Sequence, residues 1–454
     1  MERKEDIGRM HTAGLTIDFE YGELWRGLHR SNPLSFKRPY SWIVYKDRDK
    51  YMAEDWRGRI RFEDDDASEV INSCINALPE MGGLIFIKSG IYDLYSQLTI
   101  NDKYVWICGE GRGVQFHDVG TVLRKQFDGD LISISYSDPN ASGFIIEKLK
   151  IEGNRTEHTG RGISISSAKG WILRDVIIRN CGGNALYVEN CGWHRLVNVF
   201  CGACDGHIIY YTSTGDWLWV NVEADTVMTD DKDAVYLSGS PGIIINSHFE
   251  SGIDHGRHGI YIGSTTVFVI GCFIGFCGYH GIHAYNSSKC VIMGNRIVDV
   301  NCRDLTAGAY ISLASSECLV IGNVFDRSTS NYGHPKYNVR VTRDDNIIVY
   351  NRFIPDPEVG TIIDTGSGNK FKGNINYPTE NSGVAVFSGD GSTTTFRIEH
   401  GLANTPSKYV VSPLTPDADA SRTITVDSTY ITITFDTAPP SGTDNIKFGW
   451  WAEV

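Results

Sequence analysis

Residues 290–297 read CVIMGNRI and residues 318–325 read CLVIGNVF, so one pattern returns after 28 residues. In each copy a short apolar run ends at a Gly-Asn pair, and another apolar residue stands two positions after the asparagine. A repeat of this length with short strands and no amphipathic helix is typical of a parallel β-solenoid, in which each copy forms one turn.

The pattern extends in both directions from this pair. Small residues recur at spacings of 23 to 28 residues, at Asp175, Asn198, Asn221, Ser247, Cys272, Asn295, Asn323 and Asn351. Two positions later the residue is large and apolar on every turn but one, where we expect a local bulge to turn Glu223 outward. Stacked asparagines can hydrogen-bond from turn to turn inside an apolar core. The pattern predicts a right-handed parallel β-helix of about nine or ten turns, from about residue 130 to 378.

A second strand recurs in each turn and presents an outward column rich in aromatic residues. Successive side chains of a strand point to opposite faces, so every second residue belongs to this column. The segment HIIYY at 207–211 fits two registers, with Ile208 or Ile209 facing outward. Exposed rings gathered on one face predict a sugar-binding groove, and the alternative is a column that only packs against itself. The predicted substrate-binding residues are Tyr187, Tyr236, Tyr261, His280, His283, Tyr285 and Tyr310.

The two ends of the chain differ from the repeat. After Asp66 or Ser68, apolar residues at helical spacing run to Leu78, and Pro79 ends this helix. From residue 383 onward, short β-rich runs alternate with turn residues, which predicts an antiparallel β-sandwich of six or seven strands. The predicted fold is all-β, with an irregular N-terminal segment (1–62) that includes a hairpin-like stretch, a β-helix with its capping helix (63–380) and a C-terminal sandwich (381–454).

Composition excludes several classes of partner. The net charge of -13 argues against nucleic acid and against an anionic membrane, and favours a neutral or sugar-like ligand. The 11 cysteines show no paired CxxC spacing suited to zinc, so no metal and no cofactor are expected. No apolar run is long enough to cross a membrane, and no secretory signal is visible at the N-terminus.

Three aspartates collect in the stretch TDDKD at 229–233, just before a short apolar strand. Aspartate suits turns, so a solvated turn explains them one by one. Across consecutive turns, however, CDG at 204–206 precedes DDKDAVYLSGS at 230–240 and RHGIYIGS at 257–264. The stretch can therefore also be half of an active site.

These three motifs resemble those of polygalacturonase-type glycoside hydrolases, which carry NTDG, a DDC motif and GHG on consecutive turns of a β-helix. The segment before residue 100, with its helix and the run GGLIFIKSGIY, is similar to the entry module of pectate-lyase-superfamily β-helices, including phage tailspikes. The resemblance implies an extracellular or virion-associated protein with polysaccharide as its partner. It also implies a homotrimer as the assembly to test.

By position, the resemblance makes Asp205, Asp233 and His258 catalytic residues, with Asp231 as a third carboxylate. Glycosidic cleavage needs one carboxylic acid and one carboxylate, and neighbouring carboxylates raise one another's pKa. The expected function is therefore a glycoside hydrolase that cleaves a polysaccharide internally. The alternative is a non-catalytic glycan-binding adhesin or tail fibre.

The sequence departs from the family at two places. Lys232 stands where the family has the first aspartate of its pair, and His283-Ala284-Tyr285 stand where an arginine-lysine pair would hold galacturonate. These departures favour a neutral glycan over a polyuronate. A lyase is the weaker interpretation, because the groove face has few basic residues before Arg340.

Overall fold

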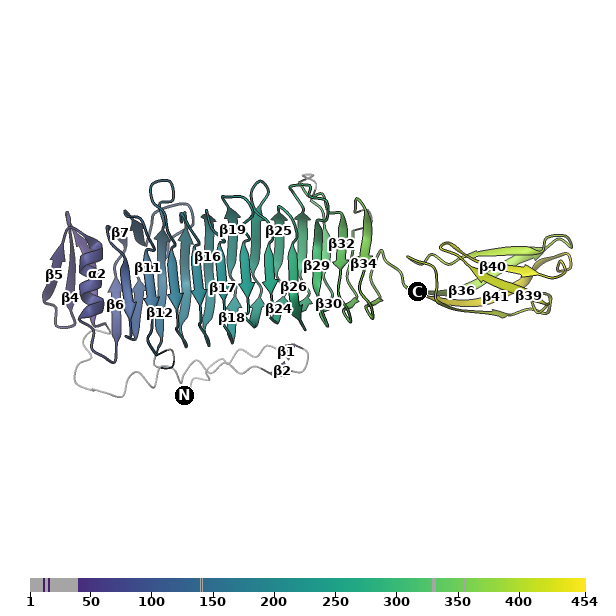
Figure 1. Cartoon of the computed structure of the whole chain (residues 1–454), viewed down its shortest axis with the longest axis horizontal. Helices are drawn as coiled ribbons and strands as arrows, with labels where there is room; N and C mark the ends of the chain where they lie inside the picture. Colours follow the sequence, from purple (N-terminus) through teal and green to yellow (C-terminus); the bar gives the residue numbers. More distant parts are fainter. Residues whose placement is uncertain are drawn as a thin grey trace, which may run out of the picture.

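The computed structural model describes residues 40–138, 140, 142–328, 332–354 and 357–454, together with the backbone of 11–12 and 15–16. These residues form a right-handed parallel β-helix of about 11 turns, followed along the long axis by a smaller antiparallel module (Figure 1). Strands make up 53% of the described residues and helices 3%, which confirms the predicted all-β class.

One side of the β-helix, which we name face A, is an 11-stranded parallel sheet. Its strands in chain order are β8 (Leu98–Asn101), β11 (Ile132–Ser135), β13 (Ile163–Ser166), β15 (Leu186–Glu189), β17 (Ile209–Thr212), β20 (Val235–Ser238), β23 (Ile260–Gly263), β26 (Ile282–Ser288), β29 (Ala309–Ser316), β32 (Tyr337–Val341) and β34 (Gly360–Asp364).

The other two sides are the halves of a 22-stranded sheet, which we name face B and face C in the order in which the chain enters them. Face B contains β3 (Trp42–Asp47), β6 (Gly83–Ile87), β9 (Val105–Gly109), β18 (Trp217–Val220), β21 (Gly242–Ile245), β24 (Val267–Ile270), β27 (Val291–Met293), β30 (Leu319–Ile321), β33 (Ile347–Val349) and β35 (Lys370–Lys372). Face C contains β7 (Gly90–Leu94), β10 (Thr121–Lys125), β19 (Glu223–Val227), β22 (His248–Gly252), β25 (Phe273–Cys277), β28 (Arg296–Val300) and β31 (Val324–Asp326). Three long strands bend through both faces: β12 (Phe144–Glu152), β14 (Ile172–Arg179) and β16 (Arg195–Cys204).

The bend between face B and face C explains the repeat in the sequence. Its first residue has a left-handed backbone, with φ of 56° at Asn198, 54° at Asn221 and 48° at Asn246, and glycine takes this place on later turns. Asparagine and glycine tolerate this conformation better than other residues do. The next residue points into the core, where Nδ2 of Asn295 donates to Oδ1 of Asn323 at 2.9 Å, and Asn323 donates to Asn351 in the same way. The predicted asparagine ladder is confirmed for these turns.

The predicted column contains a slip of one residue. Asp175, Asn198 and Asn221 occupy the left-handed position, whereas Ser247 and the later members occupy the inward position after it. On the early turns, the residue two positions further on therefore faces outward. Glu223 lies outside for this reason and not because of a bulge, and the buried Ala224 fills the core on its turn.

The N-terminal end of the solenoid is capped as expected. Helix α2 (Ala67–Asn76) begins after Asp66, whose carboxylate accepts the amide hydrogen of Ser68 at 2.8 Å. The helix buries apolar residues against the first turns. The stacked turns begin at β6, well before residue 130, so the solenoid is longer than the nine or ten turns predicted.

The segment before residue 63 was expected to be irregular, but its residues 40–62 are mostly in strands. β3 pairs antiparallel with β4 (Lys50–Asp55), and β4 pairs antiparallel with β5 (Ile60–Asp64). β3 also pairs in parallel with β6, so this hairpin extends the sheet of the solenoid. Nearer the N-terminus, β1 (His11–Thr12) and β2 (Leu15–Thr16) form a short antiparallel pair. The domain boundaries at 62 and 380 stay a proposal.

The C-terminal module is the expected antiparallel sandwich. One sheet has the order β36 (Glu380–Gly389), β41 (Gly442–Glu453), β38 (Lys408–Pro413), and the other β37 (Thr395–Glu399), β40 (Tyr430–Phe435), β39 (Arg422–Val426). A short 3-10 helix, η2 (Pro416–Ala418), joins the sheets. They enclose a second hydrophobic core, separate from that of the β-helix.

Candidate functional site

Four tyrosines form a continuous stack along the outer surface of face A, and we call them the tyrosine ladder. Tyr187, Tyr210, Tyr236 and Tyr261 stand in register on consecutive turns. Their ring centroids lie 5.2, 4.8 and 4.8 Å apart, with neighbouring ring planes within 9° of parallel. Tyr210 was missed because HIIYY fits two registers, and the structure buries both Ile208 and Ile209.

The flat faces of the ladder rings are covered by neighbouring side chains, so little ring face is free for the predicted stacking of sugars. Each inner ring lies between its two neighbours. At one end the guanidinium of Arg161 lies 3.6 Å from the ring centroid of Tyr187, and at the other Arg257 lies 5.6 Å from that of Tyr261. The half-buried rings therefore present edges to solvent, and the column packs against itself as the alternative interpretation held.

The other predicted aromatic residues have different environments. Tyr310 is fully buried, stacks on Phe325 at 5.1 Å and donates its hydroxyl hydrogen to the carbonyl of Asp326. The prediction that Tyr310 joins the outward stripe is wrong, because Ser312 is the residue in register with His283. Tyr285 is 52% exposed and is the one ring of the predicted set with an open surface.

Asp233 is fully buried beneath the ladder. Its carboxylate accepts two hydrogen bonds from Arg257, at 2.9 and 2.7 Å, and a third from the amide of His258 at 3.0 Å. Burial alone would raise the pKa of Asp233, but these partners outweigh it and hold the pKa well below its usual range. This geometry gives Asp233 a structural ion pair and no direct path to a substrate.

The residue beside Asp233 on the preceding turn is His207, not Asp205. Nδ1 of His207 accepts the amide hydrogen of Asp233 at 3.0 Å, so this nitrogen carries no hydrogen of its own. It therefore cannot donate to the carboxylate oxygen of Asp233, which lies 3.4 Å away. Asp205 lies at the surface, 3.4 Å from Arg155. Asp231 is exposed and pairs with Arg303 at 3.0 Å. The structure therefore does not bring the three predicted carboxylates into one cluster.

His258, His280 and His283 pack together beside the ladder, with ring centroids 4.9 to 5.1 Å apart. Burial lowers the pKa of His258 to about 3 and that of His283 to about 4, and it lowers the pKa of His280 as well. The three rings are thus neutral near pH 7. His280 is buried and its Nδ1 accepts the amide hydrogen of Ala309 at 3.0 Å, which leaves it no access to a ligand.

A cluster of ionisable groups on face C fits acid/base chemistry better. It consists of Glu223 and Asp225 on β19 and of His248 and Glu250 on β22, and we call it the acidic cluster. Asp225 and Glu250 stand in register on neighbouring turns, as do Glu223 and His248. All four side chains are half-buried at the surface, so solvent reaches them.

The carboxyl groups of the acidic cluster have different surroundings. Burial raises the pKa of Asp225 and of Glu223, and repulsion by Glu250 adds to the shift in both. Glu250 instead has a hydrogen-bonding partner, because Nε2 of His248 lies 2.7 Å from its Oε1. Although burial lowers the pKa of His248, the bond to Glu250 raises it further, so the net shift is upward. The carboxyl groups of Asp225 and Glu223 are thereby biased toward the acid form, whereas the carboxylate of Glu250 is bonded to His248.

Aromatic rings border the cluster on both sides along the helix axis. The column that holds Asp225 and Glu250 continues to Gly202 on one side and Gly275 on the other. A Cβ at Gly202 would lie 2.8 Å from the ring of Phe200, and one at Gly275 would lie 2.8 Å from the ring of Phe273. The two rings therefore lie over the glycine positions and cover part of the carboxyl groups between them. The sequence offered Glu223 as a signal, since it interrupted an apolar column.

A loop also crosses face C near the cluster. Arg112 donates to the carbonyl of Asn198 at 3.1 Å, and Arg179 donates to the carbonyl of Gln115. Residues 112–116 thus lie against turns that follow them by 60 residues or more. Both arginines bring positive charge to the side of the cluster that faces the N-terminal turns.

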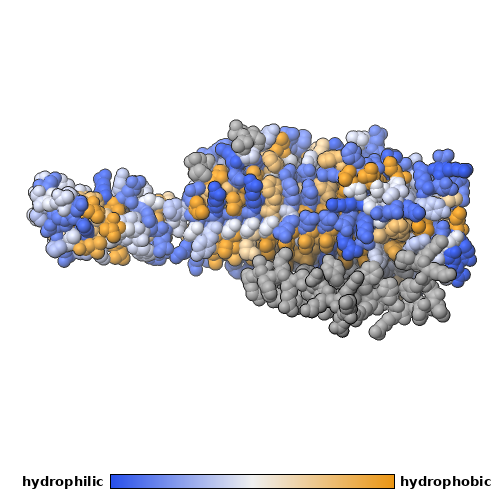
Figure 2. Space-filling view, turned by 180° about the vertical axis from the view of Figure 1, so that it is seen from behind, coloured by the Kyte–Doolittle hydropathy of each residue, from blue (hydrophilic) through white to orange (hydrophobic). Residues whose placement is uncertain are grey.

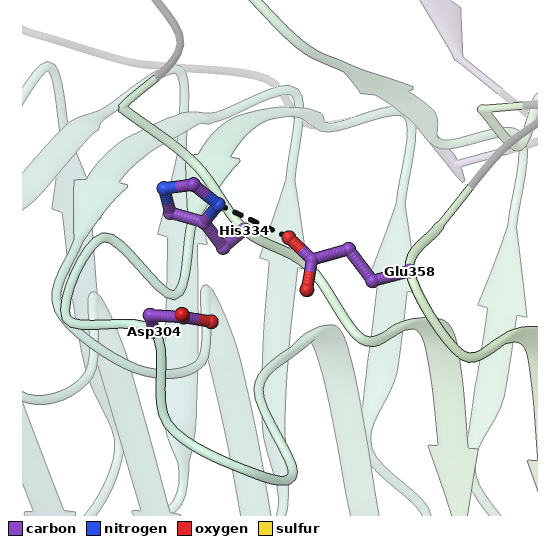
Figure 3. Close-up of side chains that lie close together, drawn as sticks. All are labelled: Asp304, His334 and Glu358. Atoms are coloured by element: carbon purple, nitrogen blue, oxygen red, sulfur yellow. Dashed lines mark hydrogen bonds and ion pairs between the residues drawn. The ribbon is translucent and has the colours of Figure 1, made fainter.

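A third group of ionisable side chains lies near the other end of the solenoid. Asp304, His334 and Glu358 converge from three segments (Figure 3). The ammonium of Lys336 contacts Asp304 at 2.5 Å and also bonds Glu358, so a lysine already neutralises these carboxylates. The arrangement is an exposed ion-pair network.

Comparisons with known proteins agree with the fold. A family model described as right handed beta helix region matches residues 207–400. ORF18 of Geobacillus virus E2 is 16% identical over 85% of this chain and 75% of its own, with a TM-score of 0.54. The DFA-IIIase of Arthrobacter chlorophenolicus A6, solved without its lid in complex with GF2, is 16% identical over 68% and 90%, with a TM-score of 0.51. Dettilon tailspike protein (gp208) is 11% identical over 84% and 90%, with a TM-score of 0.48.

No curated protein matches the sequence at a significant level. At these identities the solved structures define the class of the fold, a right-handed parallel β-helix shared by a virus protein and a carbohydrate-active enzyme. Among the residues that the structure describes, no helix is long and apolar enough to cross a membrane.

Proposed function

We propose that this protein is a glycoside hydrolase that cleaves a polysaccharide lying across face C, and that Asp225 and Glu250 carry the acid/base chemistry. The supporting observation is their register on β19 and β22, with different environments for the two carboxyl groups. Such a difference is what separates an acid from a base in glycosidases.

Asp225 is assigned as the general acid. Its raised pKa favours the protonated form, which would donate its proton to the glycosidic oxygen of the leaving sugar. Glu223 stands two residues away on the same strand face, and burial together with repulsion by Asp225 raises the pKa of Glu223 as well. Their partial burial between Phe200 and Phe273 maintains the shift, because a hydrated carboxyl group would lose it.

Glu250 is assigned as the carboxylate that attacks the sugar or activates water. His248 holds it in place through the 2.7 Å contact. Neighbouring strands lie ~4.8 Å apart, so two carboxyl groups in register come close to the ~5–5.5 Å separation of retaining glycosidases. This assignment replaces Asp233, whose buried ion pair leaves it no contact with substrate. Asp205, Asp231 and His258 stay alternatives that the same assay tests.

The second candidate is a glycan-binding adhesin or tail fibre without activity, at the cell exterior or on a virion. Its supporting observation is the tyrosine ladder, whose ring edges form an ordered surface on face A. This surface lies on a different sheet from the carboxylates of face C. The edges of the ladder rings can hydrogen-bond to a sugar chain, and the exposed ring of Tyr285 can stack on it. Such binding requires no catalytic step.

The experiment that separates these two is incubation of the protein with a panel of neutral and uronic polysaccharides, followed by measurement of new reducing ends. New ends on at least one glycan support the hydrolase. Binding without new ends on every glycan leaves the adhesin. Uronic substrates also test the neutral-glycan expectation, since Arg112 and Arg179 place cations beside the cluster.

A further inference from the structure

Face B carries a surface that differs from the other two faces of the β-helix. From β18 to β33, each strand points two side chains outward, and all twelve are apolar. They are Leu218, Val220, Ile243, Ile245, Phe268, Ile270, Val291, Met293, Leu319, Ile321, Ile347 and Val349. We call this set the apolar face.

The strands of the apolar face read as continuous hydrophobic runs: WLWV, GIII, VFVI, VIM, LVI and IIV. Strands of this kind are normally buried on both sides, whereas a strand with one side in water alternates apolar and polar residues. On face A the strands do alternate, as in VYLS, and on face C the outward positions include Glu223, Arg296 and Asp326. The outward residues of faces A and C therefore suit contact with water, whereas those of face B do not.

Charged residues mark both limits of the apolar face. Before it, the same outward columns hold Arg174 and Arg195, and after it they hold Lys370 and Lys372. The residues of the apolar face itself remain partly exposed, with Phe268 at 37% and Ile347 at 40%. Along its border a hollow of about 510 Å³ is lined by residues that include Trp193 and Trp217. Figure 2 shows hydrophobic residues gathered at the surface along the β-helix.

The size of this surface is close to what a stable interface requires. Six turns at ~4.8 Å and strands of three to four residues at ~3.3 Å give about 300–400 Å² of apolar surface. Monomeric proteins rarely expose more than a few hundred Å² in one patch. A standard interface buries ~800 Å² on each partner, of which somewhat more than half is apolar.

We infer that the apolar face is a self-association surface, covered by the same face of further copies of this chain. A second solenoid repeats at the same ~4.8 Å spacing, so its rows of side chains match these rows over the whole length. Residues 1–39 are a poorer fit, because that segment is rich in charged residues. Parallel copies would also place their C-terminal modules side by side along the long axis (Figure 1).

The C-terminal module supports this arrangement independently. The outer side of its sheet β36-β41-β38 exposes Val384, Val386, Val410 and Leu414. Cross-strand pairing puts Val384 opposite Gly449 and Val410 opposite Trp451, so these residues share one side of the sheet. A module that exposed this side in a monomer would carry a second unpartnered apolar surface. Association of parallel copies removes both surfaces from water at once.

The test is light scattering after size-exclusion chromatography of the full chain, over a range of micromolar concentrations. We expect the wild-type chain to elute as an oligomer. The double variant Ile245→Lys/Ile270→Lys, with two charges on the apolar face, should elute as a monomer. The matched control Ser166→Lys/Ser238→Lys places two lysines on face A and should remain an oligomer. Circular dichroism and thermal melting establish that each variant is folded.

If the double variant does not fold, the single cysteine variant Phe268→Cys replaces it. Under mild oxidation this side chain should form an intermolecular disulfide, whereas Ser238→Cys on face A should not. A wild-type chain that is monomeric at every concentration would overturn the inference, and the N-terminal segment or another protein would then cover the face. An oligomer that survives both lysines on face B would overturn it too, since association would use another surface.

Discussion

Asp225 and Glu250 stand in direct register on neighbouring turns of the β-helix, and both side chains reach solvent. Asp233, the carboxylate that the sequence motif favours, is instead fully buried and forms an ion pair with the partly exposed Arg257. Accessibility therefore separates a candidate catalytic pair from a structural one. Each assignment leads to a measurement.

Asp233→Asn should destabilise the fold, because it leaves the Arg257 guanidinium without its anion. Removing one partner of a buried pair typically costs about 3–5 kcal/mol. The melting temperature should therefore fall by several degrees, whereas Asp231→Asn, at an exposed position, should leave it nearly unchanged. Equal melting temperatures for both variants and the wild type would contradict the structural role of Asp233.

His194 should make the fold sensitive to acid. Burial lowers the pKa of His194 to about 3, from 6.5 in the unfolded chain. Between these values the unfolded chain binds the proton and the folded chain does not, so stability falls as the pH falls below 6.5. The loss amounts to about 2 kcal/mol at pH 5 for this one group.

His194→Phe should remove that sensitivity. The ring stacks on Trp171 at 4.0 Å, and neither ring nitrogen has a hydrogen-bond partner, so phenylalanine fits the same space. Thermal melting at pH 7 and pH 5 should show a smaller difference for this variant than for the wild type. His255→Phe, at an exposed position, is the control and should keep the wild-type difference. A variant with an unchanged pH dependence would refute the assignment.

Tyr210→Ala should weaken the fold more than it weakens glycan binding. It removes two ring stacks from the centre of the ladder, which we expect to cost about 2–3 kcal/mol. Tyr285→Ala removes an exposed ring and should leave the melting temperature unchanged. Glycan affinity is measured by titration below the melting temperature of both variants. If the ladder rings stack on sugars, Tyr210→Ala would reduce this affinity at least as strongly as Tyr285→Ala, which would contradict the prediction.

Phe200→Ala should shift the pH profile of cleavage. Opening the space over Gly202 hydrates Asp225, so its raised pKa should move toward its ordinary value. The general acid then loses its proton at lower pH. The basic limb of kcat/KM should shift to lower pH, while the acidic limb should shift less. A profile that moves as a whole, or not at all, would contradict this assignment of the acid.

The repeat predicted the fold because each turn must fill the same core position. The apolar strands, the asparagine ladder and the capping helix after Asp66 all follow from local patterns, and the structure confirms them. The slip of one residue at Asn198 arose because the left-handed position and the inward position after it both favour asparagine. Nothing within a single turn distinguishes the two.

The candidate site could not be predicted in the same way. Whether Asp233 is exposed depends on Arg257, which lies 24 residues later and on the next turn. The pairing of Asp225 with Glu250 likewise needs the register between β19 and β22. Tyr310 was predicted to continue the outward aromatic column, but Ser312 holds that register position and Tyr310 lies in the core. Turn lengths from 22 to 39 residues make such registers uncertain from sequence alone.

In the proposed mechanism, Asp225 and Glu250 on face C carry the reaction. Its most direct measurement is the rate of reducing-end release by Asp225→Asn and Glu250→Gln on a glycan that the wild type cleaves. Asp326→Asn, in the same outward column but paired with Arg296, is the matched control. We expect a loss of ~10²–10⁴-fold in each cluster variant, with unchanged melting temperatures and full activity in the control. Wild-type rates in both cluster variants, with loss of activity in Asp205→Asn, would contradict it.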